Sequence, residues 1–220
     1  MSERPTMWRA VLESQWKWTK GLALLGVMIG FAMPLLSFRI ALGSKTLTTF
    51  VTVMAAWGVG YAIVAGALGL VAAVVSWGFD HRLRHVYALS LPIPRWRYVL
   101  LRFGAGVAVL ALPITAVLVS SEIVAHSSLV PRELHAYPVA LTLRFAFAVL
   151  VAYSLFFAIS SATPRTAGFI LGGIALVIGL QIISPMVGFR AEILSRAMDV
   201  EFATPGLLAV FGGRWTLIDV

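Results

Sequence analysis

The chain has 220 residues, of which 60% are hydrophobic and 12% are charged, and its formal net charge is +8. Soluble proteins contain roughly 45–50% apolar and about 25% charged residues, so this composition excludes a soluble globular domain and a disordered chain. With no cysteine, the chain has neither disulfide bonds nor thiolate metal sites, and its positive charge is of the kind found in the cytoplasmic loops of membrane proteins, so no nucleic-acid partner is expected.

The first predicted element is an amphipathic elbow helix within residues 1–20. Between Met7 and Lys20, apolar side chains share one side of a helix and charged side chains recur on another. Because tryptophan prefers the boundary between lipid and water, we expect this helix to lie in the headgroup layer. Three tryptophans are predicted at the membrane interface: Trp8, Trp16 and Trp18. The alternative is an ordinary basic flank before the first span.

Five uncharged stretches are long enough to cross a membrane, because a hydrocarbon core of about 30 Å takes about 20 helical residues. They are residues 21–38, 46–79, 103–121, 145–164 and 166–189. The second exceeds one straight span, so we expect part of residues 46–53 at the membrane surface. The sequence therefore predicts an all-α polytopic helical bundle that forms a single transmembrane domain over residues 1–220.

A sixth apolar stretch, residues 202–213, is too short for a full crossing and contains Pro205 and three glycines. It predicts a re-entrant or surface segment, or an incomplete sixth span. Residues 189–204, before it, are expected to form an outer segment.

Basic residues set the predicted orientation. With the N-terminus inside, ten lysines and arginines fall on the cytoplasmic side and six on the outer side, with Arg214 unassigned. Since cytoplasmic loops carry the excess of basic residues, we expect a multi-pass protein of the plasma (inner) membrane with a cytoplasmic N-terminus.

The predicted spans contain no ionisable residue near their middle; the nearest, Arg102, Glu122 and Arg144, lie at span ends, where long side chains can snorkel to the interface. Carriers coupled to protons or sodium generally need an ionisable or unwound polar site near the midplane, so we expect the driving force to come from outside this domain. The remaining polar side chains are interpreted as interhelical hydrogen-bonding groups: Tyr61, Ser76, Thr115, Tyr153, Ser154 and Gln181.

Small residues in the spans predict close helix contacts. The pairs Gly26/Gly30 and Gly168/Gly172 have GxxxG spacing. In the second span, four small residues line one side of the helix: Gly58, Ala62, Gly66 and Gly69.

Histidines provide the one cluster that resembles a metal site. His81 and His85 are four residues apart, next to Asp80, and share a helix face. The other histidines, His126 and His135, are predicted on the opposite side of the membrane, so solvated loop histidines are the preferred interpretation and no cofactor is expected. The chain also lacks a nucleotide-binding loop, so it is not predicted to be an enzyme.

The loop between the second and third spans, residues 79–98, carries the most specific pattern. Residues 80–90 can form a short basic helix, with Leu83 and Tyr87 on one face and Arg84 elsewhere, and Pro92 then stops it. Such a helix would lie across the cytoplasmic mouth, tied to two spans. An ordinary positively charged loop is the alternative.

This region resembles the ABC type-2 permease family, the membrane subunits of exporters driven by separate ATPase chains. In that family an acidic residue follows the second span, a helix ends in a Leu-x-x-Pro-x-x-Arg-like element, and a basic residue opens the third span. The matching residues are Asp80, Leu89, Pro92, Arg95 and Arg102. The chain departs from the family at Arg84-His85-Val86, where a Gly-Thr-like pair is usual, and in lacking a complete sixth span.

The resemblance implies an ATP-driven exporter subunit for a hydrophobic or amphipathic substrate. Its partners would be a cytoplasmic ABC ATPase, which binds the ATP and magnesium, and a second permease copy or a paralogue in the lipid membrane. The ATPase would dock on seven residues: Asp80, Leu83, Arg84, Tyr87, Leu89, Pro92 and Arg95. Two alternatives stay open, namely a non-transporting scaffold or accessory subunit of a larger membrane complex, and a membrane metalloenzyme that uses His81 and His85.

Overall fold

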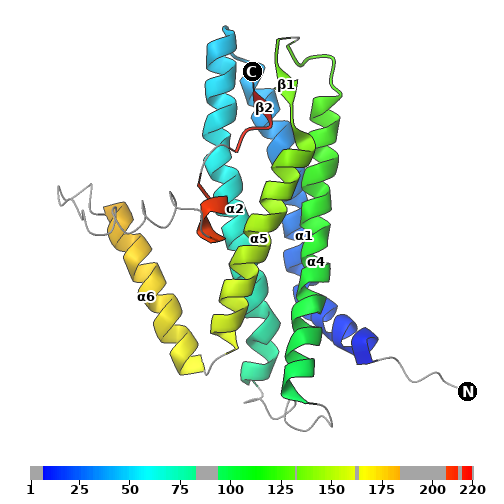
Figure 1. Cartoon of the computed structure of the whole chain (residues 1–220), viewed down its shortest axis with the longest axis vertical. Helices are drawn as coiled ribbons and strands as arrows, with labels where there is room; N and C mark the ends of the chain where they lie inside the picture. The colour runs from blue at the N-terminus through cyan, green and yellow to red at the C-terminus, as the bar shows by residue number, and fades with distance from the viewer. Residues whose placement is uncertain are drawn as a thin grey trace, which may run out of the picture.

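The structure is a computed structural model that describes residues 7–82, 94–131, 133–161, 164–183, 207–212 and 215–219. Most of these residues lie in long α-helices, as predicted (Figure 1). The helices are α1 (Met7–Ala41), α2 (Leu47–Arg82), α4 (Arg95–Ala125), α5 (Pro138–Ser160) and α6 (Pro164–Ile183). The shorter elements are the 3₁₀-helix η1 (Leu207–Val210) and the two-residue strands β1 (His135–Ala136) and β2 (Ile218–Asp219).

Among the described residues, four helices are long and apolar enough to cross a membrane. They correspond to the first four predicted spans: Gln15–Ala41, Leu47–Gly78, Trp96–Ala125 and Pro138–Ser160. The fifth predicted span forms the helix α6 over Pro164–Ile183, but α6 is not among the four, so its role as a span remains a prediction.

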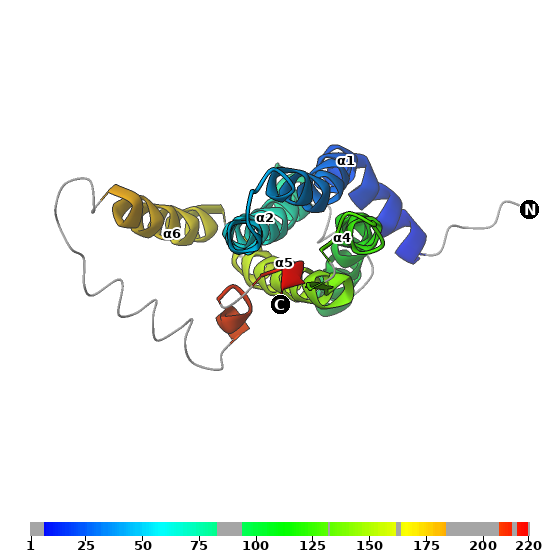
Figure 2. The ribbon, with the colours of Figure 1, turned by 90° about the horizontal axis from the view of Figure 1, so that it is seen from above.

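The four long helices α1, α2, α4 and α5 form one bundle (Figure 2). Around the bundle the helices follow the order α1, α2, α5, α4, and the most extensive contacts join α1 to α4 and α2 to α5. Helices α2 and α4 also contact each other across the bundle. Helix α6 contacts α5 and lies apart from the four, beyond α2 (Figures 1 and 2). We call the end where α2 stops and α4 starts the loop end, and the end that carries β1 and β2 the strand end.

Local sequence explains where α2 and α5 start. Helix α2 begins directly after Thr46, whose hydroxyl oxygen accepts a 3.2 Å hydrogen bond from the backbone N–H of Thr49, as in an N-terminal cap. Helix α5 begins with Pro138, a residue suited to the first helical position because it has no N–H to satisfy. Helix α2 has 36 residues and is about 54 Å long. It therefore exceeds the thickness of a hydrocarbon core.

Glycine allows two of the helix contacts in the bundle. A Cβ atom on Gly30 would lie 2.9 Å from the carbonyl oxygen of Pro113 in α4. A Cβ atom on Gly69 would lie 2.7 Å from both the backbone nitrogen of Tyr153 and the carbonyl oxygen of Val149 in α5. Because these neighbours are backbone atoms, the helices could not approach so closely with a larger residue. The close contacts predicted for these two positions are confirmed.

The second GxxxG pair behaves differently. Apart from the neighbouring backbone of α6 itself, no atom of the described residues lies within 4 Å of a Cβ atom built on Gly168 or Gly172 in α6. Within the described part of the chain, these two glycines therefore make no close helix contact.

The C-terminal stretch returns across the bundle instead of forming a helical span in its described part. Residues 207–210 form η1, and Trp215, Leu217 and Ile218 are buried. Strand β2 then pairs antiparallel with β1, so that His135 faces Asp219 and Ala136 faces Ile218. Of the alternatives predicted for residues 202–213, the described residues fit a re-entrant or surface segment. The two short strands also depart from the all-α prediction.

The N-terminal elbow prediction concerns the first turns of α1. In Figure 1 this part of α1, drawn in dark blue, slants away from the bundle, although the helix is continuous from Met7 to Ala41. A Cβ atom on Gly104 would lie 3.2 Å from the Trp8 ring, which places that ring beside α4. Trp8, Trp16 and Trp18 are 41%, 43% and 51% exposed, and their place at the membrane interface remains a prediction.

Candidate functional site

A cluster of buried polar and aromatic side chains lies at the loop end of the bundle. We call it the Arg102 cluster. It draws on four helices and consists of Gln15 from α1, Ser76 and Trp77 from α2, Tyr98 and Arg102 from α4, and Tyr153 and Phe157 from α5. Each of these side chains is 8% exposed or less.

Arg102 is the only arginine or lysine buried within the described part of the chain. Its Nε atom donates a 2.6 Å hydrogen bond to the backbone carbonyl of Ser76, and a terminal nitrogen donates to the Tyr98 hydroxyl. The guanidinium also lies 5.4 Å from the centre of the Trp77 ring, a distance at which a cation is attracted to an aromatic face. Arg102 therefore ties α4 to α2.

Helix α1 joins the cluster through Gln15. The Gln15 side-chain amide donates a 2.5 Å hydrogen bond to the Ser76 hydroxyl, and that hydroxyl donates to the carbonyl of Ala72 within α2. Since both groups are buried, the bond satisfies polar atoms that would otherwise be costly to remove from water. The interhelical hydrogen bond predicted for Ser76 is confirmed.

Helix α5 joins through aromatic rings. Phe157 packs on Trp77 with ring centres 5.2 Å apart, and Tyr153 stacks on Phe103 of α4 at 5.1 Å. The Tyr153 hydroxyl donates a 3.4 Å hydrogen bond to the Phe103 carbonyl. These contacts extend the cluster from the α2–α4 link to all four bundle helices.

The other polar side chains of the predicted spans differ in their contacts. Tyr61 and Ser37 share a 3.5 Å hydrogen bond between α2 and α1, as predicted for Tyr61. The Thr115 hydroxyl instead donates to the carbonyl of Leu112 in its own helix, and Ser154 is exposed. The side chain of Gln181 lies outside the described residues.

The cluster borders the predicted docking loop. Ser76 is six residues before the end of α2 at Arg82, and Arg102 is seven residues after the start of α4 at Arg95. At 1.5 Å per residue, both lie about 10 Å from these helix ends. Of the predicted docking residues, Leu83, Arg84, Tyr87, Leu89 and Pro92 lie outside the described residues. Asp80 and Arg95 lie in α2 and α4 respectively, and their side chains are not described.

A second arginine at the end of a predicted span is bound by the C-terminal segment. Arg144 of α5 donates a 3.1 Å hydrogen bond from Nε to the carbonyl of Val210, and a second bond to the carbonyl of Gly212. Its guanidinium lies 5.1 Å from the centre of the Trp215 ring. Arg144 therefore anchors Val210, Gly212 and Trp215 to the bundle. The sequence offers no sign of this, because the acceptors are backbone carbonyls 66 and 68 positions away.

In the residues with described placement, no group of three or more metal-ligating side chains comes together. His85 of the alternative metal site lies outside those residues, so that alternative stays untested. No family model, curated protein or solved structure matches the chain. The arguments for its function therefore come from its own residues and their contacts.

Proposed function

We propose that the chain is the membrane-spanning permease subunit of an ATP-driven ABC exporter, in which a separate cytoplasmic ATPase docks on residues 79–98. The subunit works with a second copy or a paralogue in the plasma (inner) membrane, with its N-terminus in the cytoplasm. Its substrate is hydrophobic or amphipathic. The four helices of spanning length and apolarity support a place in the membrane, and the residues of the 79–98 loop that resemble ABC type-2 permeases support the family.

The observation that carries this proposal is the bond between Arg102 and Ser76 at the base of the loop. A force on the loop acts on the end of α2 and on the start of α4 together, because the loop connects them. The Arg102 cluster links that pair of helices to α1 through Gln15 and to α5 through Phe157. An ATPase that pushes on the loop would therefore move all four helices of the bundle and not only the ends of α2 and α4.

Substitutions on the predicted docking face test the proposal. The chain is purified through an affinity tag from its native membrane in mild detergent, and magnesium-dependent ATP hydrolysis is measured in the purified material. We expect hydrolysis to accompany the wild-type chain and to be lost from the double variant Leu83→Asp/Tyr87→Asp. Leu129→Asp, which places an aspartate in an exposed loop at the strand end, is the control and should keep it.

Two results would reject the exporter function. One is a wild-type chain purified intact with no ATP hydrolysis; the other is hydrolysis that the double variant does not change. The first result would favour a scaffold or accessory subunit of a larger membrane complex. That second candidate is also favoured by the C-terminal segment, whose described residues form a 3₁₀-turn and a strand where the family has a sixth span.

A further inference from the structure

The first turns of α1 carry an exposed pair of lysines at the loop end of the bundle. Lys17 and Lys20 are three positions apart, so their side chains are neighbours on the helix surface. Trp16, beside them, is 43% exposed. Gln15 and Thr19 are buried, and with 3.6 residues per turn Lys17 projects about 160° away from either of them. The lysine pair therefore faces away from the bundle.

The spacing of charges along α1 places the pair at the edge of a membrane. No charged residue lies between Lys20 and Arg39, which are nineteen positions apart, and this separation corresponds to about 28 Å of helix. A hydrocarbon core is about 30 Å thick. When α1 crosses a membrane, Lys20 therefore lies at one boundary of the core and Arg39 at the other. Lys17 lies about one turn further out, at the level of the head groups.

The charge of the pair is not balanced within α1. Glu13 is the only acidic residue of this helix, and its carboxylate accepts a 3.0 Å hydrogen bond from Nε of Arg9. In the part of the chain that the structure describes, neither Lys17 nor Lys20 has an ion pair within 4 Å. Since like charges at neighbouring helix positions repel each other, an anion that contacts both ammonium groups would remove an unfavourable interaction.

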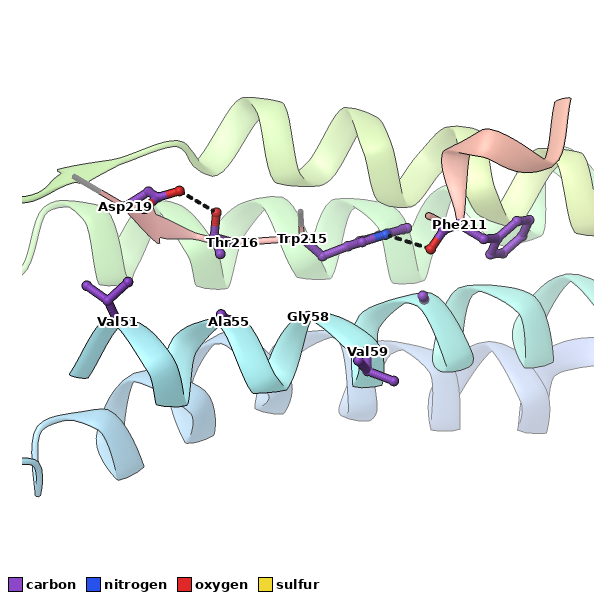
Figure 3. A pocket seen from close by; sticks show the side chains of 9 residues that line it. Val51, Ala55, Gly58, Val59, Phe211, Trp215, Thr216 and Asp219 are labelled. Carbon is purple, nitrogen blue, oxygen red and sulfur yellow. Dashed lines mark hydrogen bonds between the residues drawn. The ribbon is translucent and has the colours of Figure 1, made fainter. Parts of the chain in front are cut away.

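The two ends of the bundle also differ in their balance of described charges. At the strand end, three basic and three acidic side chains occur together: Arg39, Lys45, Arg144, Glu122, Glu133 and Asp219. The last of these lies beside α2, where its carboxylate accepts a hydrogen bond from Thr216 (Figure 3). At the loop end, the exposed side chains are five basic and one acidic: Arg9, Lys17, Lys20, Arg97, Arg165 and Glu13. This excess of basic side chains favours anionic lipids in the leaflet at the loop end.

An apolar strip continues from the lysine pair toward the middle of the membrane. Leu24 and Met28 follow Lys20 by four and eight positions, so all three share one side of α1. The two apolar side chains are 62% and 68% exposed. In a bilayer, exposed apolar side chains of a spanning helix contact acyl chains. A lipid with its phosphate at the lysines would therefore have an acyl chain along this strip, which a soluble phosphate lacks.

The lysines also select among lipid head groups. Each ammonium group donates up to three hydrogen bonds and accepts none, so it suits phosphate oxygens. Phosphatidylcholine carries a cationic choline next to its phosphate, and this choline would meet the lysines with like charge. Phosphatidylglycerol has the phosphate without the cation, so its net charge is complementary to the pair.

We propose that Lys17 and Lys20 together bind the phosphate of one anionic phospholipid in the leaflet at the loop end. The acyl chain of this lipid lies along Leu24 and Met28. The site does not depend on the proposed exporter function, because it is complete within α1 and can be tested without an ATPase.

The test compares two lipids that differ in their heads. The chain is placed in phosphatidylcholine nanodiscs that contain increasing fractions of phosphatidylglycerol or phosphatidylcholine brominated in the upper part of the acyl chains. Bromine quenches nearby tryptophan fluorescence, and the Trp16→Phe variant identifies the part of the signal that comes from Trp16. A basic residue near an anionic lipid surface contributes about a fivefold preference. With two lysines, we expect the association constant at Trp16 to be ~10-fold or more higher for phosphatidylglycerol than for phosphatidylcholine.

Three double variants separate the pair from general charge. Lys17→Gln/Lys20→Gln should lower the preference for phosphatidylglycerol about fivefold or more. Lys17→Arg/Lys20→Arg keeps both charges and should keep the preference. The matched control is Arg97→Gln/Arg165→Gln, which removes the same number of charges from exposed positions at the loop end. This control should keep the preference as well.

The proposal is overturned if wild-type protein binds the two lipids equally, or if both glutamine variants lose the preference to the same extent. It is also overturned if soluble glycerol phosphate displaces the brominated lipid better than chloride does at the same ionic strength, because the pair would then be a site for free phosphate. Should Lys17→Gln/Lys20→Gln fail to fold in a thermal melt, the single variants Lys17→Gln and Lys20→Gln replace it, and each should lose part of the preference.

Discussion

The Nε atom of Arg102 donates a 2.6 Å hydrogen bond to the backbone carbonyl of Ser76, which joins α4 to α2 across 26 positions of sequence. Residues 83–93 connect these two helices in the chain. The bond therefore closes a ring made of the end of α2, the loop and the start of α4. In the proposed exporter, the ATPase would move the end of α2 and the start of α4 together.

Removal of the Arg102 side chain should destabilise the bundle. Arg102→Met keeps much of the apolar stem but loses the bonds to Ser76 and Tyr98. Hydrogen bonds to charged groups contribute about 1.5–3 kcal/mol each, so we expect a clear drop in the thermal midpoint measured in detergent. Arg102→Lys keeps the charge without the planar guanidinium. Its thermal midpoint should fall between those of the wild type and Arg102→Met.

The control for this prediction is Arg97→Met on the same helix, because Arg97 is exposed. Its thermal midpoint should match that of the wild type. Equal midpoints for Arg102→Met and Arg97→Met would contradict the structural role given to Arg102.

The close contact at Gly69 gives a second prediction. Gly69→Val should force α2 and α5 apart, since even a Cβ atom there would lie 2.7 Å from backbone atoms of α5. Overpacking typically costs about 1–3 kcal/mol, and occasionally more. We expect a loss of monodisperse protein in size-exclusion chromatography, together with a lower thermal midpoint.

Gly168→Val in α6 makes the same chemical change where nothing lies within 4 Å of the new Cβ atom. It carries the same change in helix propensity as Gly69→Val, so the difference between the two variants isolates packing. A Gly69→Val protein as stable as Gly168→Val would show that α2 and α5 do not pack as described.

The anchor of the C-terminal segment gives a third prediction. Arg144→Gln loses the cation over Trp215 and weakens the bonds to the carbonyls of Val210 and Gly212. Local opening of a segment is measured by amide hydrogen exchange. A loss of about 1.4 kcal/mol in the free energy that holds the segment closed raises its opening equilibrium tenfold. We therefore expect exchange in residues 207–219 to accelerate roughly tenfold or more.

Arg39→Gln serves as the matched control, since Arg39 is exposed at the end of α1. It should leave exchange in residues 207–219 unchanged. If Arg144→Gln also leaves it unchanged, Arg144 does not hold the segment in place.

The sequence predicted the parts of the fold that follow from local pattern. Long apolar runs predicted the helices α1, α2, α4 and α5, because a backbone in lipid must satisfy its own hydrogen bonds. The row of small residues on α2 predicted a closely packed face. In the structure, Gly69 meets α5 on that face and Gly58 meets the C-terminal segment.

The contacts of Arg102 and Arg144 could not be predicted in this way. Arg102 and Arg144 lie near the ends of apolar runs, where the local pattern favours snorkelling. Their acceptors are backbone carbonyls, at Ser76 and at Val210 and Gly212, which every residue possesses. Only the fold determines which carbonyl lies within reach. The pairing of β1 with β2 was missed for a similar reason, since two residues are too few to show the alternation typical of a strand.

The account rests on the predicted docking loop, residues 79–98, facing the cytoplasm, where an ATPase can reach it. The chain has no cysteine, so single-cysteine variants report one position each. We compare Ser90→Cys in the loop with Ser128→Cys, an exposed position at the strand end, and treat intact and permeabilised cells with a membrane-impermeant maleimide. The account predicts that Ser128→Cys is labelled in intact cells and Ser90→Cys after permeabilisation only. Labelling of Ser90→Cys in intact cells would contradict it.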